Sequence, residues 1–384
     1  MTTTKNNEHK ELNVPNLRFP EFQGEWKKTT IGDIADLYKG TGISKDQLSD
    51  DGEPCILYGE LYTKYKSETI REVISKTNID NTKLVRSKDN DVIIPCSGET
   101  AEDIATARCV LNGNILLGGD LNIIRLHGYD GAFMSYQLNG RRKYDIAKVA
   151  QGVSVVHLYG EHLKGVKTIN PCLEEQKKIA NLLSLLDERI ATQNKIIDKL
   201  QSLIKGLRVS LMQIENGNIV HLGEIARIYQ PQTISSTELT EDGFLVYGAN
   251  GIIGKYKEYN HKTEQICITC RGNTCGMVNY TKPMSWITGN AMVINTDEHQ
   301  NKVCKRYLYH YLSAYNFNSI ISGSGQPQIV RTPLEQLKVT LPTFLEQKQK
   351  ATFLDKIQGK IEICNKTLNL YLQQKQYLLR QMFI

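Results

Sequence analysis

Two long stretches of the chain carry hydrophobic residues at alternating steps of four and three positions. Such heptad spacing predicts a helix with one apolar stripe, and the first stretch, 174–213, gives a helix about 60 Å long at 1.5 Å per residue. The stripe of the first stretch is interrupted at Gln193, and that of the second, after Pro342, at Lys375. The first stripe consists of Ile179, Leu183, Leu186, Ile190, Ile197, Leu200, Ile204, Leu207 and Leu211. The second consists of Leu354, Ile357, Ile361, Cys364, Leu368, Tyr371, Leu378 and Met382.

An exposed apolar stripe is unfavourable in water, and each stripe is the obvious cover for the other. We therefore expect the two helices to pack as an antiparallel coiled coil. The helices are not interchangeable, because the second has Lys350, Lys356 and Lys375 where the first has apolar residues.

The regions before each helix show a different pattern, of short apolar runs separated by glycine-rich and polar turns. The run 91–96 and the run 114–117 are typical of strands, with glycines at 98, 113, 118 and 119. The sequence predicts α/β (α+β) lobes here. Together with the helices, the organisation is a disordered tail at 1–14, a first lobe at 15–170, a helix at 171–215, a second lobe at 216–341 and a helix at 342–384.

The chain contains this arrangement twice. Many residues of the first helix are identical to the residue 171 positions further along, in the second helix. These residues are Glu175, Gln176, Lys177, Ala180, Leu183, Ile190, Asn194 and Lys195. The lobe ends align at the same offset, and the lobe beginnings align at an offset of 191, where 31–35 matches 222–226. The middles of the lobes match only loosely, so the scaffold repeats while the loops differ.

Composition and charge bound the function without defining it. The chain has 384 residues, 47 Lys and Arg against 41 Asp and Glu, and a formal net charge of +6, which tolerates a polyanionic ligand without requiring one. The nine scattered cysteines favour reduced thiols over a disulfide framework. No apolar run approaches the length of a membrane span and the N-terminus resembles no signal peptide, so we expect a cytoplasmic protein with no membrane partner.

A search for catalytic motifs gives no site. The glycines at 251 and 254 do not have phosphate-loop spacing, and neither a zincin helix nor a serine nucleophile elbow occurs. Cys267 and Cys270, with Cys275 nearby, lack a second pair of ligands at zinc-finger spacing, so we expect buried thiols and no metal. His310 lies in an aromatic run and is interpreted as a packed residue of a helix. We predict no catalysis by this chain alone.

Polar loops recur at matching places in both lobes. They run over 38–45, 97–100, 271–274 and 322–328 and are rich in Arg, Lys, Asn, Gln, Ser and Thr, the side chains that contact phosphates and base edges. Solvated turns are the alternative interpretation of any one loop. Their recurrence in both lobes favours a binding surface.

This ordered, duplicated set resembles the specificity subunits of bacterial type I restriction-modification systems, from about Pro15 to the C-terminus. The opening 15–22, leading to Trp26 and 31–34, and the proline with a Glu-Gln-Lys helix start after each lobe carry the resemblance. It implies a non-catalytic subunit with two target recognition domains, each reading one half of a split, asymmetric DNA target, with the helices setting the gap. It also implies two modification subunits and restriction subunits as partners, which would carry S-adenosylmethionine, ATP and Mg and perform adenine methylation and cleavage.

On this interpretation, residues of both lobes bind double-stranded DNA. The residues expected to neutralise phosphates are Lys39, Lys45, Arg271 and Arg331. The residues expected to read bases are Thr41, Ser44, Gln151, Ser154, Gln232, Asn273, Gln326 and Gln328. The outward Gln and Lys clusters of the helices are candidate docking surfaces for the modification subunits, or simply solvated faces.

Two alternatives belong to other classes. A structural adaptor with two protein-binding lobes would show no salt-dependent DNA binding. A self-contained methyltransferase or nuclease would need an Asn/Asp-Pro-Pro-Tyr/Phe motif or a carboxylate cluster near a Lys, and neither occurs. The letters of the half-sites, the gap length and the stability of the chain without partners do not follow from the sequence.

Overall fold

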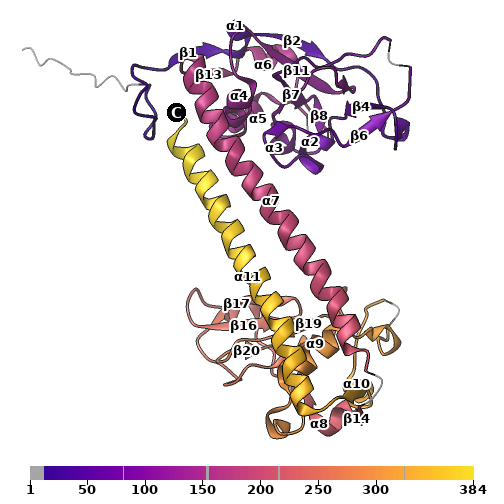
Figure 1. Ribbon diagram of the computed structural model, residues 1–384. Coiled ribbons are helices and arrows are strands. Elements are labelled where there is room, and N and C mark those ends of the chain that lie inside the picture. The colour runs from indigo at the N-terminus through magenta and orange to yellow at the C-terminus, as the bar shows by residue number, and fades with distance from the viewer. Residues whose placement is uncertain (1–12, 81, 153–154, 215–216, 324) are drawn as a thin grey trace, which may run out of the picture. The chain divides into compact units, whose positions relative to one another are not determined.

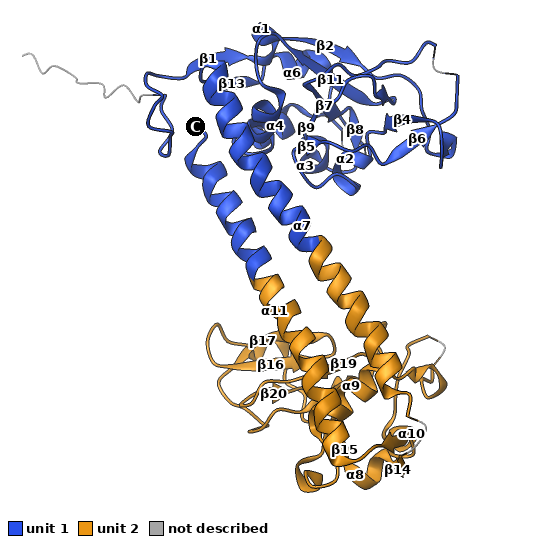
Figure 2. Ribbon diagram, viewed as in Figure 1, with its two compact units in different colours: residues 1–194, 367–384 blue, residues 195–366 orange. Residues whose placement is uncertain are grey.

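The computed structural model describes residues 13–80, 82–152, 155–214, 217–323 and 325–384. It divides into two units (Figure 2). Unit 1 comprises Met1–Asn194 with Thr367–Ile384, and unit 2 comprises Lys195–Lys366. Most of the predicted tail lies outside the described residues, but Asn13, which we had assigned to it, is held by unit 1, because its carbonyl accepts a hydrogen bond of 2.8 Å from the Trp26 N–H.

Unit 1 is organised around a five-stranded sheet (Figure 1). All its neighbouring strands are antiparallel except β9 and β5. In spatial order they are β2 (Ala35–Lys39), β11 (Leu121–Leu126), β7 (Asp91–Pro95), β9 (Arg108–Val110) and β5 (Thr69–Ile70). A second sheet contains β10 (Leu116–Leu117), β4 (Glu53–Ile56), β6 (Ser75–Thr77) and β3 (Leu48–Ser49).

Shorter elements complete unit 1. The two-stranded pairs are β1 (Lys27–Thr30) with β13 (Lys167–Asn170) and β8 (Ser97–Gly98) with β12 (Val156–His157). The helices are α1 (Ile31–Ile34), η1 (Lys45–Gln47), α2 (Glu60–Thr63), α3 (Ala101–Ile104), α4 (Gly131–Asn139), α5 (Lys143–Val149) and α6 (Gly160–Lys164).

Unit 2 repeats this plan with fewer strands. Its main sheet is antiparallel throughout: β15 (Arg227–Tyr229), β21 (Ala291–Asn295), β18 (Ile266–Thr269) and β19 (Val278–Tyr280). The second sheet has β17 (Gly251–Tyr256), β16 (Phe244–Gly248) and β20 (Trp286–Ile287), and β14 (Asn218–His221) pairs with β22 (Lys338–Leu341). The helices are α8 (Leu222–Ile225), η2 (Ser236–Glu238), η3 (Asp297–His299), α9 (Lys305–Ala314), η4 (Phe317–Ser319) and α10 (Arg331–Glu335).

The period of two along the central strands explains their continuous apolar runs. In β7, Val92 and Ile94 pack into the core that α4 covers, whereas Ile93 points to the opposite face and a second cluster. In β18 of unit 2, Ile266 and Ile268 likewise enter a different cluster from Cys267. Both sheets are therefore buried on two faces.

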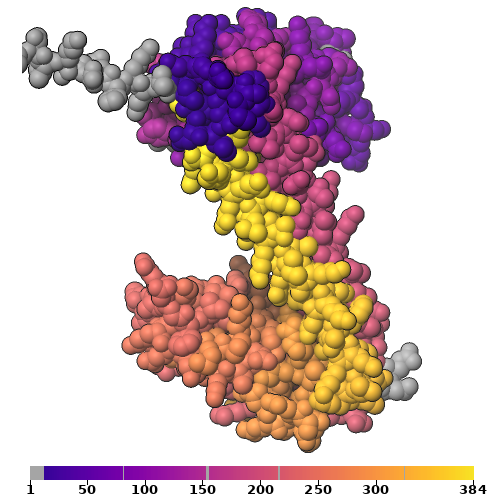
Figure 3. Space-filling model, turned by 60° about the vertical axis from the view of Figure 1, so that its left-hand side comes forward, coloured from indigo at the N-terminus to yellow at the C-terminus, as the bar shows by residue number. Residues whose placement is uncertain are grey.

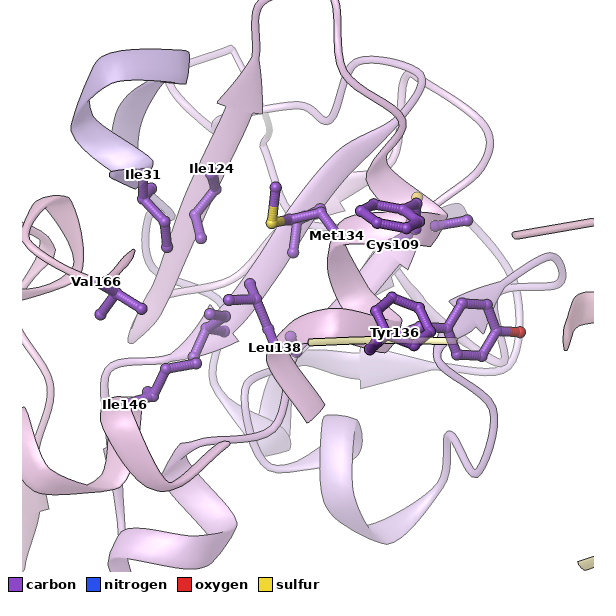
Figure 4. Close-up of a cluster of buried hydrophobic side chains, with 14 of the residues drawn as sticks. Ile31, Cys109, Ile124, Met134, Tyr136, Leu138, Ile146 and Val166 are labelled. Carbon is purple, nitrogen blue, oxygen red and sulfur yellow. The ribbon is translucent and has the colours of Figure 1, made fainter. Parts of the chain in front are cut away.

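The main core of unit 1 lies between its sheet and α4 (Figure 4). Met134 and Leu138 of α4 lie beside Ile124 of β11 and Ile146 of α5. All four side chains are fully buried. The core extends to residues near the C-terminus, because Phe383 stacks on Phe133 of α4 with ring centroids 5.1 Å apart.

Two long helices, α7 (Leu173–Met212) and α11 (Phe344–Gln381), contribute to both units. In unit 1, Asp187 pairs with Lys375, and Leu183 and Leu186 share a core with Leu378. On the surface of the same unit the last turn of α11 lies beside the N-terminal segment, where the Gln381 carbonyl accepts from the Leu17 N–H at 2.9 Å (Figure 3).

In unit 2, Arg208 donates to Gln358 and Lys350 to the Leu211 carbonyl, so rising numbers in α7 meet falling numbers in α11 and the helices are antiparallel. The lysines that interrupted the apolar pattern are thereby explained in two cases. Lys350 satisfies a carbonyl at the C-terminal end of α7, and Lys375 binds Asp187 and Glu68.

The predicted seam residues are buried or half-buried. The fully buried ones are Leu183, Leu186, Ile197, Leu354 and Ile361, and the half-buried ones are Ile190, Leu200, Ile357 and Leu368. The predicted fold class, two pseudo-repeated α/β (α+β) lobes with long antiparallel helices, is confirmed.

Candidate nucleic-acid interface

Each unit contains the same crossing of two loops at the end of a central strand. In unit 1, His157 pairs with Ser97, just beyond β7, and the Leu158 N–H donates to the Cys96 carbonyl at 2.8 Å. In unit 2, Gln328 pairs with Arg271, just beyond β18, and the Ile329 N–H donates to the Cys270 carbonyl at 3.0 Å. The second loop repeats at the offset of 171, since 157 corresponds to 328.

A short hairpin closes each crossing. Gln151 and His157 exchange two backbone hydrogen bonds of 2.9 and 2.7 Å, and Ser322 and Gln328 exchange two of 2.9 and 2.8 Å. We call these segments hairpin 1 (151–157) and hairpin 2 (322–328); residues 153–154 and 324 within them lie outside the described residues.

Both hairpins turn at a glycine that the backbone requires. Gly152 has a φ of +127° and Gly323 a φ of +93°, conformations that L side chains rarely adopt. A Cβ would also collide with the Val155 carbonyl in hairpin 1 and the Gln326 carbonyl in hairpin 2. Gly152 and Gly323, which correspond at the offset of 171, therefore allow the same positive-φ turn in both hairpins.

A third segment approaches each crossing from the loop after β2 or β15. In unit 1, the Gly40 N–H donates to the Leu121 carbonyl, and the neighbouring Asp120 carbonyl accepts from the Cys96 N–H at 2.7 Å. In unit 2, the Gln230 side chain donates to the Gly289 carbonyl at 3.1 Å and to the Cys270 sulfur. Both loops therefore converge on the end of the central strand.

The structure brings several predicted DNA-binding residues together. In unit 2, Arg271 and Asn273 share a loop that is tied to hairpin 2, because the Gly272 N–H donates to the Pro327 carbonyl at 3.0 Å, and hairpin 2 carries Gln326 and Gln328. Gln232 follows two residues after Gln230. In unit 1, Lys39 reaches Asp120 at 3.9 Å, and Gln151 closes hairpin 1.

Other predicted residues have local structural roles. Thr41 accepts a hydrogen bond from the Val85 N–H at 3.1 Å, Ser44 caps η1, and Lys45 is the first residue of η1. Arg331 begins α10 and pairs with Glu335 of the same helix at 2.7 Å. Ser154 lies outside the described residues. All eleven described candidates are exposed, as a binding surface requires.

Sequence reasoning did not select His157 or Tyr159 at the crossing of unit 1, and it included Ser97 only as part of the polar loop 97–100. Ser97 and His157 stand where unit 2 has Arg271 and Gln328, and the exposed Tyr159 stacks with His157 at 6.3 Å between ring centroids. The signal for His157 was available, because subtracting 171 from the selected Gln328 gives it directly.

Unit 1 also has a pocket of about 910 Å³ beside the loop that carries Ser44 and Lys45. Tyr58, Tyr62 and Lys64 line its other wall. In unit 2 the strand β17 follows β16 directly, and a Cβ on Gly248, which aligns with Gly59, would contact the Ile253 side chain. The two lobes thus differ in the region of this pocket.

Side chains of catalytic type have structural partners. His310 is fully buried; Arg208 donates to its Nδ1, so its Nε2 donates to Asp355 at 2.8 Å, and burial lowers its pKa. Cys267 is buried in β18, where burial raises its pKa, and all nine cysteines are free thiols. Among the described residues, no group of three or more His, Cys, Asp and Glu could hold a metal ion.

No helix in the described part of the chain has the length and apolar character that crossing a membrane requires.

The duplicated plan matches a known domain at both places. The type I restriction modification DNA specificity domain matches residues 23–202 and again residues 215–372. The chain therefore belongs to the type I restriction-modification DNA specificity family.

Named relatives and solved structures agree with this membership. The chain is 25% identical to the type I restriction enzyme MjaVIII specificity subunit of Methanocaldococcus jannaschii, over 91% of this chain and 89% of that one. It is 33% identical to the EcoprrI specificity subunit of Escherichia coli over 35% of this chain and 34% of the other. The crystal structure of a type I S subunit from M. genitalium has the same fold, with a TM-score of 0.72 at 20% identity, covering 97% of this chain and 99% of that chain.

Proposed function

We propose that this chain is the DNA sequence-recognition subunit of a type I restriction-modification complex, in which each unit reads one half of a bipartite, asymmetric duplex target. The observation that carries the proposal is the repeated crossing: one backbone framework presents Ser97 and His157 in unit 1 but Arg271 and Gln328 in unit 2. Equal frameworks with different side chains, of which His157, Arg271 and Gln328 are exposed, suit the reading of two different half-sites.

Within the complex, the chain's role is recognition and not catalysis. Two modification subunits, using S-adenosylmethionine, would methylate adenines, and restriction subunits, using ATP and Mg, would translocate and cut DNA. Such a complex would act in the cytoplasm, where the duplex lies. Exposed cations such as Lys39, Lys45 and Arg271 would contact phosphates or bases, so affinity should fall steeply with salt.

The long helices would set the gap between the half-sites. Both α7 and α11 run without interruption from one unit into the other. Inserting four residues after Asn194 and four after the matching Asn365 would lengthen each helix by about 6 Å. The methylated motif should then acquire a longer gap with unchanged half-sites; altered half-site letters would contradict the spacer role.

The experiment that tests the function is methylome sequencing in a host without a type I system of its own. The chain is expressed with its modification subunit, and the modification subunit alone is the control. A new split motif, methylated in both halves, is expected only when this chain is present. If the assembled complex methylates no new motif, and DNA binding shows no salt dependence, the chain is a protein-binding adaptor instead.

A further inference from the structure

We propose that one pair of positions at each crossing determines which base its lobe accepts, and that Arg271 makes unit 2 require a guanine. The pairs are Ser97 with His157 in unit 1 and Arg271 with Gln328 in unit 2. We refer to them as the reading pairs. This inference rests on the proposed function and names the residues that carry it out.

The first support is geometric equivalence. The members of each reading pair are direct partners across an antiparallel pairing, so their side chains project from the same face. The hydrogen bonds to the Cys96 and Cys270 carbonyls follow one residue later in both units. The Cα atoms of Ser97 and His157 therefore occupy the same positions relative to the sheet of unit 1 as those of Arg271 and Gln328 do relative to the sheet of unit 2.

The second support is anchoring. His157 is exposed between Val156 and Leu158, which are 8% and 1% exposed. Gln328 is exposed beside Ile329, which is 2% exposed. Alternation along the hairpin strand therefore fixes the backbone inside the lobe while every second side chain faces outward. Holding a side chain in this way is what selective contact with a base edge requires.

The third support is the chemistry of the residues. A guanidinium donates two parallel hydrogen bonds to O6 and N7 of guanine, and a glutamine amide matches N6 and N7 of adenine. Arg271 and Gln328 supply both groups side by side. In unit 1, Ser97 is short and 9% exposed, so outward reading falls to His157, with Tyr159 stacked against it. The two lobes thus present different donors from one framework.

The test uses the complete complex with three single variants, Arg271→Ala, His157→Gln and Lys262→Ala, and determines the methylated motif of each. Arg271→Ala should relax one guanine position of one half-site, with discrimination against the other bases falling roughly 5- to 150-fold. His157→Gln should change one position in the other half-site. Lys262, an exposed lysine beyond the opposite end of β18, controls for the loss of one positive charge and should leave every letter unchanged.

Selection of bound sequences from a randomised duplex library at reduced salt gives a second measurement that does not depend on methylation. Retention of all preferences by Arg271→Ala overturns the inference, and so does loss of preference across a whole half-site. Changes by Arg271→Ala and His157→Gln in the same half-site also overturn it. In each of these cases a split motif for the unaltered complex leaves the proposed function standing, whereas absence of that motif refutes the function itself.

Discussion

Units 1 and 2 share a scaffold but differ in what connects one pair of neighbouring antiparallel strands in their second sheet. In unit 1, 57–74 separates β4 from β6 and contributes α2 and β5; in unit 2, only Ala249 and Asn250 separate β16 from β17. The sheets, the crossings and the helix starts repeat, because each depends on buried contacts or obligatory backbone hydrogen bonds. Elements outside this shared set, such as α2 and β5, can vary, so recognition can diverge without loss of the fold.

The units also differ in how they hold the long helices. In unit 1, Lys375 of α11 lies between Glu68 and Asp187, at 2.5 and 2.6 Å, and Asp187 accepts from the Tyr136 hydroxyl. Burial opposes the charge on Lys375, but the two carboxylates outweigh it and raise its pKa. In unit 2, Asp355 of α11 binds Arg306 and His310. At the offset of 171, Lys375 corresponds to Ile204 and Asp355 to Ser184, so each lobe has its own ionic contact with the helices.

The largest effect should come from removing the cation of unit 1. Lys375→Met removes the cation that neutralises the buried Glu68 and Asp187 and should destabilise unit 1 by about 3–5 kcal/mol, while unit 2 keeps its stability. Hydrogen exchange, which reports each unit separately, measures this. The exposed Lys360→Met on the same helix is the control. If Lys375→Met and Lys360→Met changed the stability of unit 1 equally, the buried ionic contact would contribute nothing to that stability.

A symmetric pair of substitutions tests what the units share. Leu183 and Leu354 correspond at the offset of 171 and are both fully buried, in the cores of unit 1 and unit 2. Replacing either by alanine should cost its own unit about 2–5 kcal/mol. Denaturant unfolding monitored by hydrogen exchange distinguishes the units. A substitution that weakened both units equally would show that they do not unfold separately.

A smaller symmetric effect is expected at the helix starts. Gln176 accepts from the Asp130 N–H and donates to the Pro171 carbonyl; Gln347 does the same with the Cys304 N–H and the Pro342 carbonyl. Replacement by leucine leaves buried backbone groups unpaired and should cost each unit about 1–3 kcal/mol. Thermal unfolding of each single variant measures this loss of stability. If one glutamine proves neutral, the two helix starts are not equivalent.

The mildest contrast concerns pH. In unit 2, Nδ1 of His261 donates to the Asn260 side-chain oxygen, so its Nε2 accepts from the Tyr229 hydroxyl at 2.8 Å, and burial lowers the pKa of His261 to about 4. An unfolded histidine takes up its proton near pH 6.5, so the contribution of the neutral folded ring is complete above that pH and is lost as pH falls toward 4. The urea midpoint of unit 2 should therefore decrease between pH 7 and pH 5.5, and His261→Gln should reduce that decrease. An identical decrease in the variant would assign the pH dependence to other groups.

The sequence predicted the repeated features better than the unique ones. The heptad spacing predicted 174–213, and α7 spans Leu173–Met212, because an apolar stripe with a fixed period has one low-energy solution. It could not explain Lys375, whose partner Glu68 lies 307 residues away. Among the candidate DNA-binding residues, Arg271 and Gln328 were selected by residue type, but their pairing depends on backbone hydrogen bonds between distant loops. The helix α10, which begins at Arg331, was not predicted, because five residues carry too short a pattern to be recognised.

The division of unit 1 between two separated stretches has a consequence for synthesis. Phe133 and Trp26 emerge early, yet Met382 and Phe383, which belong to the same core, follow only after Lys195–Lys366 has been made. At ribosomal speeds that interval lasts roughly 10–30 s. The first lobe of a nascent chain therefore exposes part of its apolar core throughout the synthesis of unit 2, whereas the second lobe is complete as soon as its own segment emerges.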